Sequence, residues 1–182
     1  MIPLITQTPR LTILAASRAL LTAELHKPHY FPVLLGAAMP ANWPPVGYDR
    51  EAMEYFLEKL TAGGRDAAGW YNWYALLKPA GDQPRTLVGS GGFMGPPDAA
   101  GTAEIGYSIV SDWCGQGIAT ELVSGLVQQA AATGLVHRLV AHTQPENLAS
   151  QKVLLANGFA SLGTDVDGQL RFELAVAPAP VL

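Results

Sequence analysis

The chain has 182 residues, of which 49% are hydrophobic and 14% are charged, and its formal net charge is −4 at pH 7. This composition is typical of a folded globular protein with a sizeable core and excludes a disordered chain. No run of Lys or Arg is present, which argues against nucleic acid or an anionic membrane surface as the main partner, and one cysteine excludes an internal disulfide. Because neither a leader-like start nor an apolar run of about 20 residues is visible, we expect a soluble cytoplasmic protein.

The first 60 residues predict one strand and three helices. These are a strand over residues 8–13, a helix from the N-cap Ser17 to His26, a short helix over 29–36 and a helix from the N-cap Asp49 to Leu60. Ser and Asp favour the N-cap because their side chains accept a hydrogen bond from the first helical turn. The segment 39–45 contains three prolines, which remove N–H donors and predict a rigid loop.

The rest of the chain predicts six more strands and two longer helices. The strands are expected over 70–77, 86–93, 103–110, 138–142, 160–166 and 170–176, and the helices over 118–133 and 147–157. Gly134 and Gly158 end the two helices, and Asp167-Gly168 forms the last turn. We therefore expect an α/β fold, with a mixed, twisted sheet of about six to seven strands flanked by helices on both faces. One domain is expected over residues 8–176, with a C-terminal tail over 177–182.

The most informative motif joins the strand 103–110 to the helix that begins at Ile118. Its glycines, Gly115 and Gly117, allow a tight turn without a Cβ atom in the way. The free N–H groups at the start of the helix then converge with the positive end of the helix dipole. This arrangement binds anions, and a diphosphate is the expected ligand.

Gly115-x-Gly117-x-Ala119 resembles the pyrophosphate loop of the GNAT superfamily of acyl-CoA-dependent N-acetyltransferases, although Cys114 stands where Arg or Gln is usual. The segment from Asn147 through Ser150 to Gly158-Phe159 is similar to the helix that lines the pantetheine arm in that family. Thr8-Pro-Arg10-Leu11 looks like the corresponding segment of ribosomal-protein N-terminal acetyltransferases. The resemblance covers roughly residues 8–176.

The resemblance implies a GNAT fold and acetyl-CoA as co-substrate, with the acetyl group passing directly to a primary amine. It also implies that the end of the strand 103–110 splays from its neighbour and offers free backbone groups to the pantetheine arm. The residues expected to bind the cofactor are Ile109, Val110, Cys114, Gly115, Gln116, Gly117, Ile118, Ala119, Thr120, Asn147 and Ser150.

Three residues are candidates for catalysis. Glu104 is expected to act as a general base, directly or through water; a carboxylate that faces solvent or an arginine is the alternative. In many GNAT enzymes a tyrosine protonates the departing thiolate, but Leu154 occupies that position here. Ser150 is the replacement that we expect, although a helix-capping serine is nearly as good an interpretation. Asn147 either binds the pantetheine amide or caps the helix.

Two other patterns carry less functional information. Gly89-Ser90-Gly91-Gly92 lies before Pro96 and Pro97 rather than before a helix, so a hairpin corner is expected instead of a dinucleotide site. The four histidines show no metal-ligand spacing, so no metal is expected, and His142 is expected to pack in the core, with a place in the lining of the acceptor cleft as the alternative. Acceptor specificity is expected from residues 42–45, the aromatic strand 70–74 and the final hairpin.

The acceptor remains open at this point. A protein or peptide α-amine is favoured, and a small-molecule amine, such as an amino-acid-like metabolite or antibiotic, is the alternative. A non-catalytic acyl-CoA sensor is a further alternative, because Cys114 and Leu154 depart from the family pattern. Both a monomer and a homodimer are compatible with the sequence.

Overall fold

The computed structural model describes residues 3–177 and contains one eight-stranded sheet with the order β1-β2-β3-β4-β5-β6-β8-β7. The strands are β1 (Ile5–Gln7), β2 (Leu11–Ala15), β3 (Asn72–Leu77), β4 (Thr86–Phe93), β5 (Thr102–Ile109), β6 (Arg138–Thr143), β7 (Ala160–Thr164) and β8 (Leu170–Ala175). Only the β5–β6 pair is parallel among these described strands; the other neighbours run antiparallel. The expected mixed α/β fold is confirmed. Of the predicted tail, residues 178–182 lie outside the described part of the chain.

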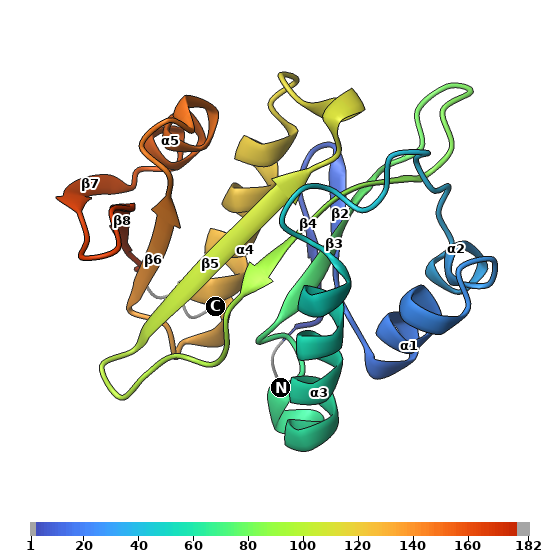
Figure 1. The fold of residues 1–182 in the computed structure, drawn as a ribbon, viewed down its shortest axis with the longest axis horizontal. Helices are drawn as coiled ribbons and strands as arrows, with labels where there is room; N and C mark the ends of the chain where they lie inside the picture. The colour runs from blue at the N-terminus through green and yellow to red at the C-terminus, as the bar shows by residue number, and fades with distance from the viewer. Residues whose placement is uncertain (1–2, 178–182) are drawn as a thin grey trace.

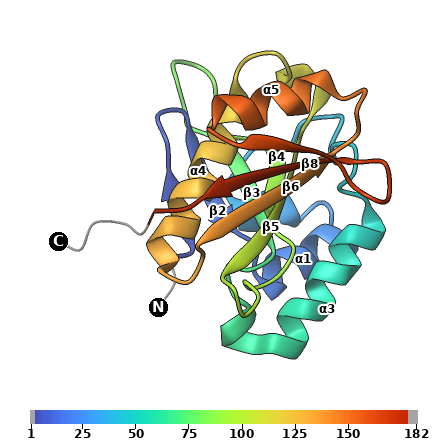
Figure 2. The ribbon, with the colours of Figure 1, turned by 90° about the vertical axis from the view of Figure 1, so that its left-hand side faces the viewer.

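Helices cover both faces of the sheet (Figures 1 and 2). They are α1 (Arg18–His26), α2 (Phe31–Leu35), α3 (Arg50–Ala67), α4 (Ile118–Thr133) and α5 (Leu148–Ala156), with a 3₁₀ turn, η1, at Ser111–Trp113. The core between the sheet and α1 to α3 is built around side chains such as Leu21, Phe56 and Tyr74. The opposite core, under α4 and α5, contains Leu122, Leu126 and Leu154. All eight residues of β4 are therefore buried, on both faces of the sheet.

The predicted helix caps are confirmed. Ser17 accepts a hydrogen bond from Leu20 N, and Asp49 accepts one from Ala52 N. Asn147 caps α5 in the same way. The predicted end of α3 at Leu60 is wrong, because the helix continues to the buried Ala67 through a kink at Gly64, where φ is 56°.

Two strand predictions need correction. β1 was not expected; it pairs with β2 in the register Ile5↔Leu14 and raises the number of strands to eight. The segment Gly89–Gly92 lies inside β4 rather than at a hairpin corner. Its glycines are explained by close packing, since a Cβ atom on Gly89 would lie 2.5 Å from Ile109 Cδ1 and 2.8 Å from Ser108 O. The actual corner lies in residues 94–101, between β4 and β5.

The centre of the sheet opens between β5 and β6. These strands pair only over Thr102–Glu104, whereas β5 continues along β4 to Ile109 and β6 continues along β8 to Thr143. Figure 1 shows the two strands diverging towards the end at which α5 and the start of α4 lie. The predicted splay is therefore present, and the two segments with recognisable motifs lie at its open end.

Candidate active site

The turn before α4 has the geometry of an anion site. Gly115 and Gly117 have φ values of 72° and 76°, in the left-handed region that favours glycine. Gly117 is the N-cap of the 16-residue helix α4, and no side chain caps its first N–H groups. The buried Ile118 anchors the helix start in the core, while residues 114–117 are exposed and Ala119 and Thr120 are half-buried. Free donors and the positive end of the helix dipole point to the same place here, which is the arrangement of helix starts that bind anions.

Arg10, in the turn between β1 and β2, lies over this loop. Its Nη1 donates to the carbonyl oxygen of Gln116 at 2.9 Å, and its Nε forms a 2.7 Å ion pair with Glu121 Oε2. A Cβ atom added to Gly117 would lie 3.3 Å from Arg10 Nη2. Arg10 was recognised in the sequence analysis only as part of a family-like segment. No local pattern in the sequence reveals its contact with Gln116, which is 106 residues away. Arg10 orders the loop and places a guanidinium beside it.

Glu121, in the first turn of α4, holds the N-terminal segment in place. One of its oxygens accepts from Thr8 Oγ1 at 2.7 Å and from Arg10 N at 2.6 Å. Burial alone would raise the pKa of this carboxyl. The hydrogen bonds from Thr8 and Arg10, together with the guanidinium charge, hold the pKa below its usual value. The carboxylate form is therefore stabilised by folding.

The backbone groups at the end of β5 differ from the expectation in one respect. The N–H of Val110 donates to Val88 O at 3.0 Å, so the expectation that it is free to bind a ligand is wrong. Since the direction of backbone groups alternates along a strand, those of Ile109 and Tyr107 face the splay instead. The exposed thiol of Cys114 lies 3.7 Å from Ile109 O and 3.6 Å from Val110 O.

The start of α5 brings Asn147 and Ser150 to the other side of the splay. Asn147 Oδ1 accepts from Ser150 N at 3.1 Å, so this side chain serves as a helix cap. Tyr107 Oη lies 2.8 Å from Ser150 Oγ, where either hydroxyl can donate, and 3.2 Å from Ser150 O, which is an alternative acceptor for the single phenol proton. Burial raises the pKa of the Tyr107 phenol, against the effect of its hydrogen bond to Ser150, so the phenol stays protonated at neutral pH. Leu154 is fully buried in the core.

Tyr107 is a functional candidate that the sequence analysis missed. The family pattern directs attention to position 154 of α5, whereas this hydroxyl comes from β5 and meets the first turn of α5. Register along β5 would have placed Tyr107 at the splay. The contact with Ser150 spans 43 residues and depends on how α5 lies against the sheet.

Glu104 lies where the pairing of β5 with β6 ends, and its partner is a histidine. His142 Nδ1 lies 2.9 Å from Glu104 Oε1, and His142 Nε2 lies 3.6 Å from Asp165 Oδ2. The expectation that His142 packs in the core is wrong, because its side chain is 20% exposed and lies between two carboxylates. The other oxygen of Glu104 has no hydrogen-bond partner within residues 3–177, and its side chain is 45% exposed. This oxygen is available to a ligand or to water.

A hollow of about 140 Å³ opens over β3, β4 and β5 on the face covered by α3. Its polar wall contains Tyr48, Asn72, Ser90 and Ser108. Gly91, Gly92 and Gly106 line it as well, and a Cβ atom on Gly106 would lie 2.8 Å from Cε of Met94, another lining residue. Tyr107 borders the hollow as well, but its side chain packs on the opposite face of the sheet, with the core under α4 and α5.

The predicted acceptor loop lies beside this hollow. Asn42 Nδ2 donates to Ser111 Oγ at 2.6 Å, which joins the loop to η1 at the end of β5. The ring of Trp43 packs edge-on against Tyr48, with centroids 5.7 Å apart. The loop 39–48 therefore forms one wall of the region in which an acceptor is expected.

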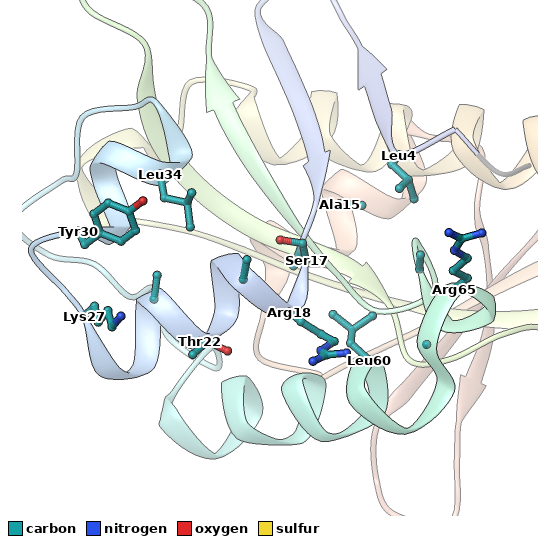
Figure 3. Close-up of a pocket in the computed structure, with 15 residues that line it drawn as sticks. Leu4, Ala15, Ser17, Arg18, Thr22, Lys27, Tyr30, Leu34, Leu60 and Arg65 are labelled. Carbon is teal, nitrogen blue, oxygen red and sulfur yellow. The ribbon is translucent and has the colours of Figure 1, made fainter.

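A wider groove of about 870 Å³ lies elsewhere, between β1, α1, α2 and the end of α3. Figure 3 shows Arg18, Lys27 and Arg65 around its mostly apolar surface. None of the predicted site residues lines this groove. The groove is therefore separate from the splay and its motifs.

Within residues 3–177, no group of three or more His, Cys, Asp or Glu side chains is placed to hold a metal ion. None of the helices in that part of the chain combines the length and apolar character that a bilayer span needs.

Comparison with known proteins gives consistent results. Residues 19–160 match the family described as the acetyltransferase (GNAT) domain. A protein of Bacillus subtilis (strain 168), named uncharacterized N-acetyltransferase YjdG, is 30% identical over 153 residues, which are 84% of this chain and 88% of that protein.

Solved structures resemble the whole fold. RimL, a ribosomal L7/L12 α-N-protein acetyltransferase in complex with coenzyme A, aligns with a TM-score of 0.61 and 19% identity over 96% of this chain and 97% of that chain. MccE, a microcin C7 self-immunity acetyltransferase in complex with acetyl-CoA and AMP, aligns with a TM-score of 0.59 and 20% identity over 93% and 94%. A GNAT acetyltransferase from Bacillus anthracis aligns with a TM-score of 0.61 and 18% identity over 94% and 98%. At these identities the structures show a common fold.

Proposed function

Because the chain belongs to the GNAT family of acyl-CoA-dependent N-acetyltransferases, we propose that acetyl-CoA is its acyl donor and that the α-amine of a peptide or protein is its acceptor. The observation that carries the proposal is the splay between β5 and β6, which leads from the Gly115–Gly117 turn to the Ser150–Tyr107 contact. An α-amine has an ordinary pKa near 8 and a lysine amine one near 10.4. The α-amine therefore suits a weak carboxylate base better.

The residues around the splay fit an extended acyl-CoA. The diphosphate would lie at the uncapped start of α4, with Arg10 beside it to add positive charge. Backbone groups of Ile109 and Tyr107 would bind the pantetheine arm, in place of the occupied Val110 N–H. Cys114 lacks the cationic side chain that an Arg would supply at this position, whereas the guanidinium of Arg10 lies beside Gly117.

Glu104 is proposed as the general base. His142 holds one carboxylate oxygen at 2.9 Å and leaves the other free to accept a proton. Glu104 and Ser108 lie on the same face of β5, and Ser108 lines the hollow. Four residues of an extended strand separate the two by about 13 Å. The proton of the acceptor amine would therefore reach Glu104 through water.

Ser150 is proposed to stabilise the departing thiolate. When Tyr107 Oη donates its proton to Ser150 Oγ, the hydroxyl hydrogen of Ser150 is free to point at the sulfur. This pair offers a proton donor in the region where Leu154 has none. Its geometry favours catalysis over a purely sensory acyl-CoA site.

The decisive experiment measures release of free CoA from acetyl-CoA with a panel of amines. The panel contains an alanyl tetrapeptide amide with a free α-amine, the same peptide acetylated at its N-terminus, a lysine-containing Nα-blocked peptide, and tyramine as a small amine. We expect CoA release to increase with the free α-amine peptide and to stay at the hydrolysis background with its acetylated counterpart. Saturable acetyl-CoA binding without amine-dependent CoA release would indicate a sensor and refute the proposal.

Glu104→Gln tests the base. We expect turnover of the preferred amine to fall at least about tenfold, because an amide cannot accept the proton. The matched control is Glu58→Gln, a change of the same chemistry at an exposed position of α3. Equal turnover of Glu104→Gln and the wild type would remove Glu104 from the mechanism.

A further inference from the structure

A carboxylate in α1, distant in sequence from the splay, is surrounded by hydrogen-bond donors. Glu24 Oε1 accepts from Trp43 Nε1 at 2.8 Å, and Oε2 accepts from Tyr48 Oη at 2.8 Å and from Tyr74 Oη at 2.5 Å. Burial raises the pKa of Glu24, while these three hydrogen bonds act to lower it. Burial and the charge of Glu24 raise the pKa of Tyr48 and Tyr74 well above the usual value, so both phenols keep their protons.

A chain of hydrogen bonds continues from Glu24 to the 140 Å³ hollow. Tyr48 Oη accepts from Asn72 Nδ2 at 3.0 Å, and Asn72 Oδ1 accepts from Ser90 Oγ at 2.5 Å. Asn72 and Ser90 are 3% and 4% exposed, and both line the hollow together with Tyr48. The chain therefore connects a carboxylate on α1 with a hydroxyl at the centre of the sheet.

The carboxylate determines the direction of every bond in this chain. Glu24 Oε2 accepts from Tyr48 Oη, so Tyr48 uses its single proton on Glu24 and can only accept from Asn72. Asn72 must then direct its NH₂ group to Tyr48 and its oxygen to Ser90. Ser90 donates its one proton to that oxygen. The hydroxyl of Ser90 consequently presents lone pairs, and no proton, to the hollow.

We propose that Glu24, acting through Tyr48 and Asn72, fixes Ser90 as a hydrogen-bond acceptor for an N–H of the acceptor amine. The inference rests on the proposed acetyl transfer. Ser90 pairs with Ser108 of β5, the strand that borders the splay, and both residues line the hollow. An amine held at Ser90 thus lies one strand away from the splay in which the thioester is proposed to bind, on the face opposite to the side chain of Tyr107. Glu24 is a positioning residue, and the amide of Asn72 excludes a simple proton relay, because an amide does not readily pass a proton on.

Glu24→Gln is expected to reverse the chain. Trp43 Nε1 can only donate, so it retains the amide oxygen and the new NH₂ group faces the two phenols. Tyr48 then accepts from the glutamine and donates to Asn72, whose amide turns over and donates to Ser90. Ser90 is left to point its proton into the hollow, where it opposes an N–H donor. We expect the KM for the amine to increase about tenfold or more, with the KM for acetyl-CoA unchanged.

The sharpest comparison is between Tyr48→Phe and Tyr74→Phe. Each removes one phenolic hydroxyl that donates to the same oxygen of Glu24, but only Tyr48 is a member of the chain to Ser90. With the amine of the panel that gives the highest kcat/KM, we expect the amine KM to increase about tenfold for Tyr48→Phe and less than about twofold for Tyr74→Phe. Thermal melting of both variants checks that the fold is retained.

Ser90→Ala keeps the inference testable if a tyrosine variant does not fold. It should increase the amine KM as much as Tyr48→Phe does, and the double variant should be no worse than Ser90→Ala alone, because the two residues act in one chain. Equal amine KM values for Tyr48→Phe and Tyr74→Phe, or an unchanged KM for Ser90→Ala, would overturn the inference and leave acetyl transfer intact. A wild-type protein that releases no CoA with any amine would instead refute the proposed function before a variant is made.

Discussion

At the scale of single residues, the contact between Tyr107 and Ser150 is the feature that most changes the expected chemistry. A serine hydroxyl alone is a poor proton donor, and its hydrogen can also turn to a backbone carbonyl in its own helix. When the phenol at 2.8 Å donates to Ser150 Oγ, the serine keeps its own hydrogen for another acceptor. In the proposed mechanism the two hydroxyls, which come from different elements, therefore act together as the proton donor to the thiolate.

Ser150→Ala should therefore lower kcat about tenfold, with the dissociation constant of acetyl-CoA within about twofold of the wild type. Tyr107→Phe should lower kcat by a smaller factor, because Ser150 remains but is no longer oriented. Stopped-flow measurement of CoA release and calorimetric titration with acetyl-CoA separate the two quantities. Ser161→Ala, an exposed serine of β7, is the control. Full turnover by Ser150→Ala would exclude the role proposed for this hydroxyl.

At the scale of elements, the start of α4 depends on two glycines that differ in their surroundings. Both have positive φ, which costs an alanine about 1 kcal/mol. A Cβ atom on Gly115 would meet nothing within 4 Å, whereas one on Gly117 would lie 3.3 Å from the guanidinium of Arg10. An alanine at either position strains the backbone, but only an alanine at position 117 also displaces Arg10. A comparison of the two variants therefore distinguishes the two effects.

Gly117→Ala should weaken acetyl-CoA binding by about tenfold or more and lower the free energy of unfolding by about 1 kcal/mol. Gly115→Ala should cause a similar loss of stability but a clearly smaller loss of affinity, because Arg10 keeps its place. Isothermal titration with acetyl-CoA and urea unfolding measure the two effects. Equal affinities for the two variants would show that Arg10 does not contribute to the site.

The predictability of the elements follows from how local their determinants are. The limits of α4, Ile118–Thr133, were predicted correctly because Gly117 and Gly134 mark its ends in the sequence itself. β1 was missed because its three residues form a strand only by pairing with β2. The glycines of β4 were misplaced because their purpose, close approach of β5, is visible only in three dimensions.

At the scale of the whole molecule, Glu121 ties the N-terminal turn to α4 across 111 residues. Its pKa is lowered in the folded protein, so its stabilising contribution is complete above the unfolded pKa, which is near 4.3, and is lost as the pH falls through the folded value. The contact therefore stabilises the protein at neutral pH and weakens in acid.

Glu121→Gln should lower the free energy of unfolding at pH 7 by about 1–2 kcal/mol, because the charge-assisted hydrogen bonds from Arg10 are weakened. The difference from the wild type should shrink as the pH falls below about 4 and disappear when the wild-type carboxyl is protonated. Urea unfolding over a series of pH values measures it. A difference that does not vary with pH would show that packing, rather than charge, accounts for the loss.

How much of the site could be predicted also depends on how local its determinants are in the sequence. Asn147, Ser150 and the glycine turn were recognised because each belongs to a short motif. Arg10 was not assigned to the loop, since its contact depends on the placement of the β1–β2 turn. The chain from Glu24 to Ser90 joins four separate segments, and no periodicity or spacing reveals it.

The short pairing of β5 with β6 has a further consequence for cooperativity. Three residue pairs, Thr102–Glu104 with Arg138–Val140, form the ladder between the part of the sheet that contains β1 to β5 and the part that contains β6 to β8. Local opening requires little free energy where few backbone bonds must break. A ligand that bridges this seam adds its binding energy to the junction, since it binds the closed form and not the open one. Hydrogen exchange at β6 and β8 should therefore slow on acyl-CoA binding, well beyond the residues that the ligand touches.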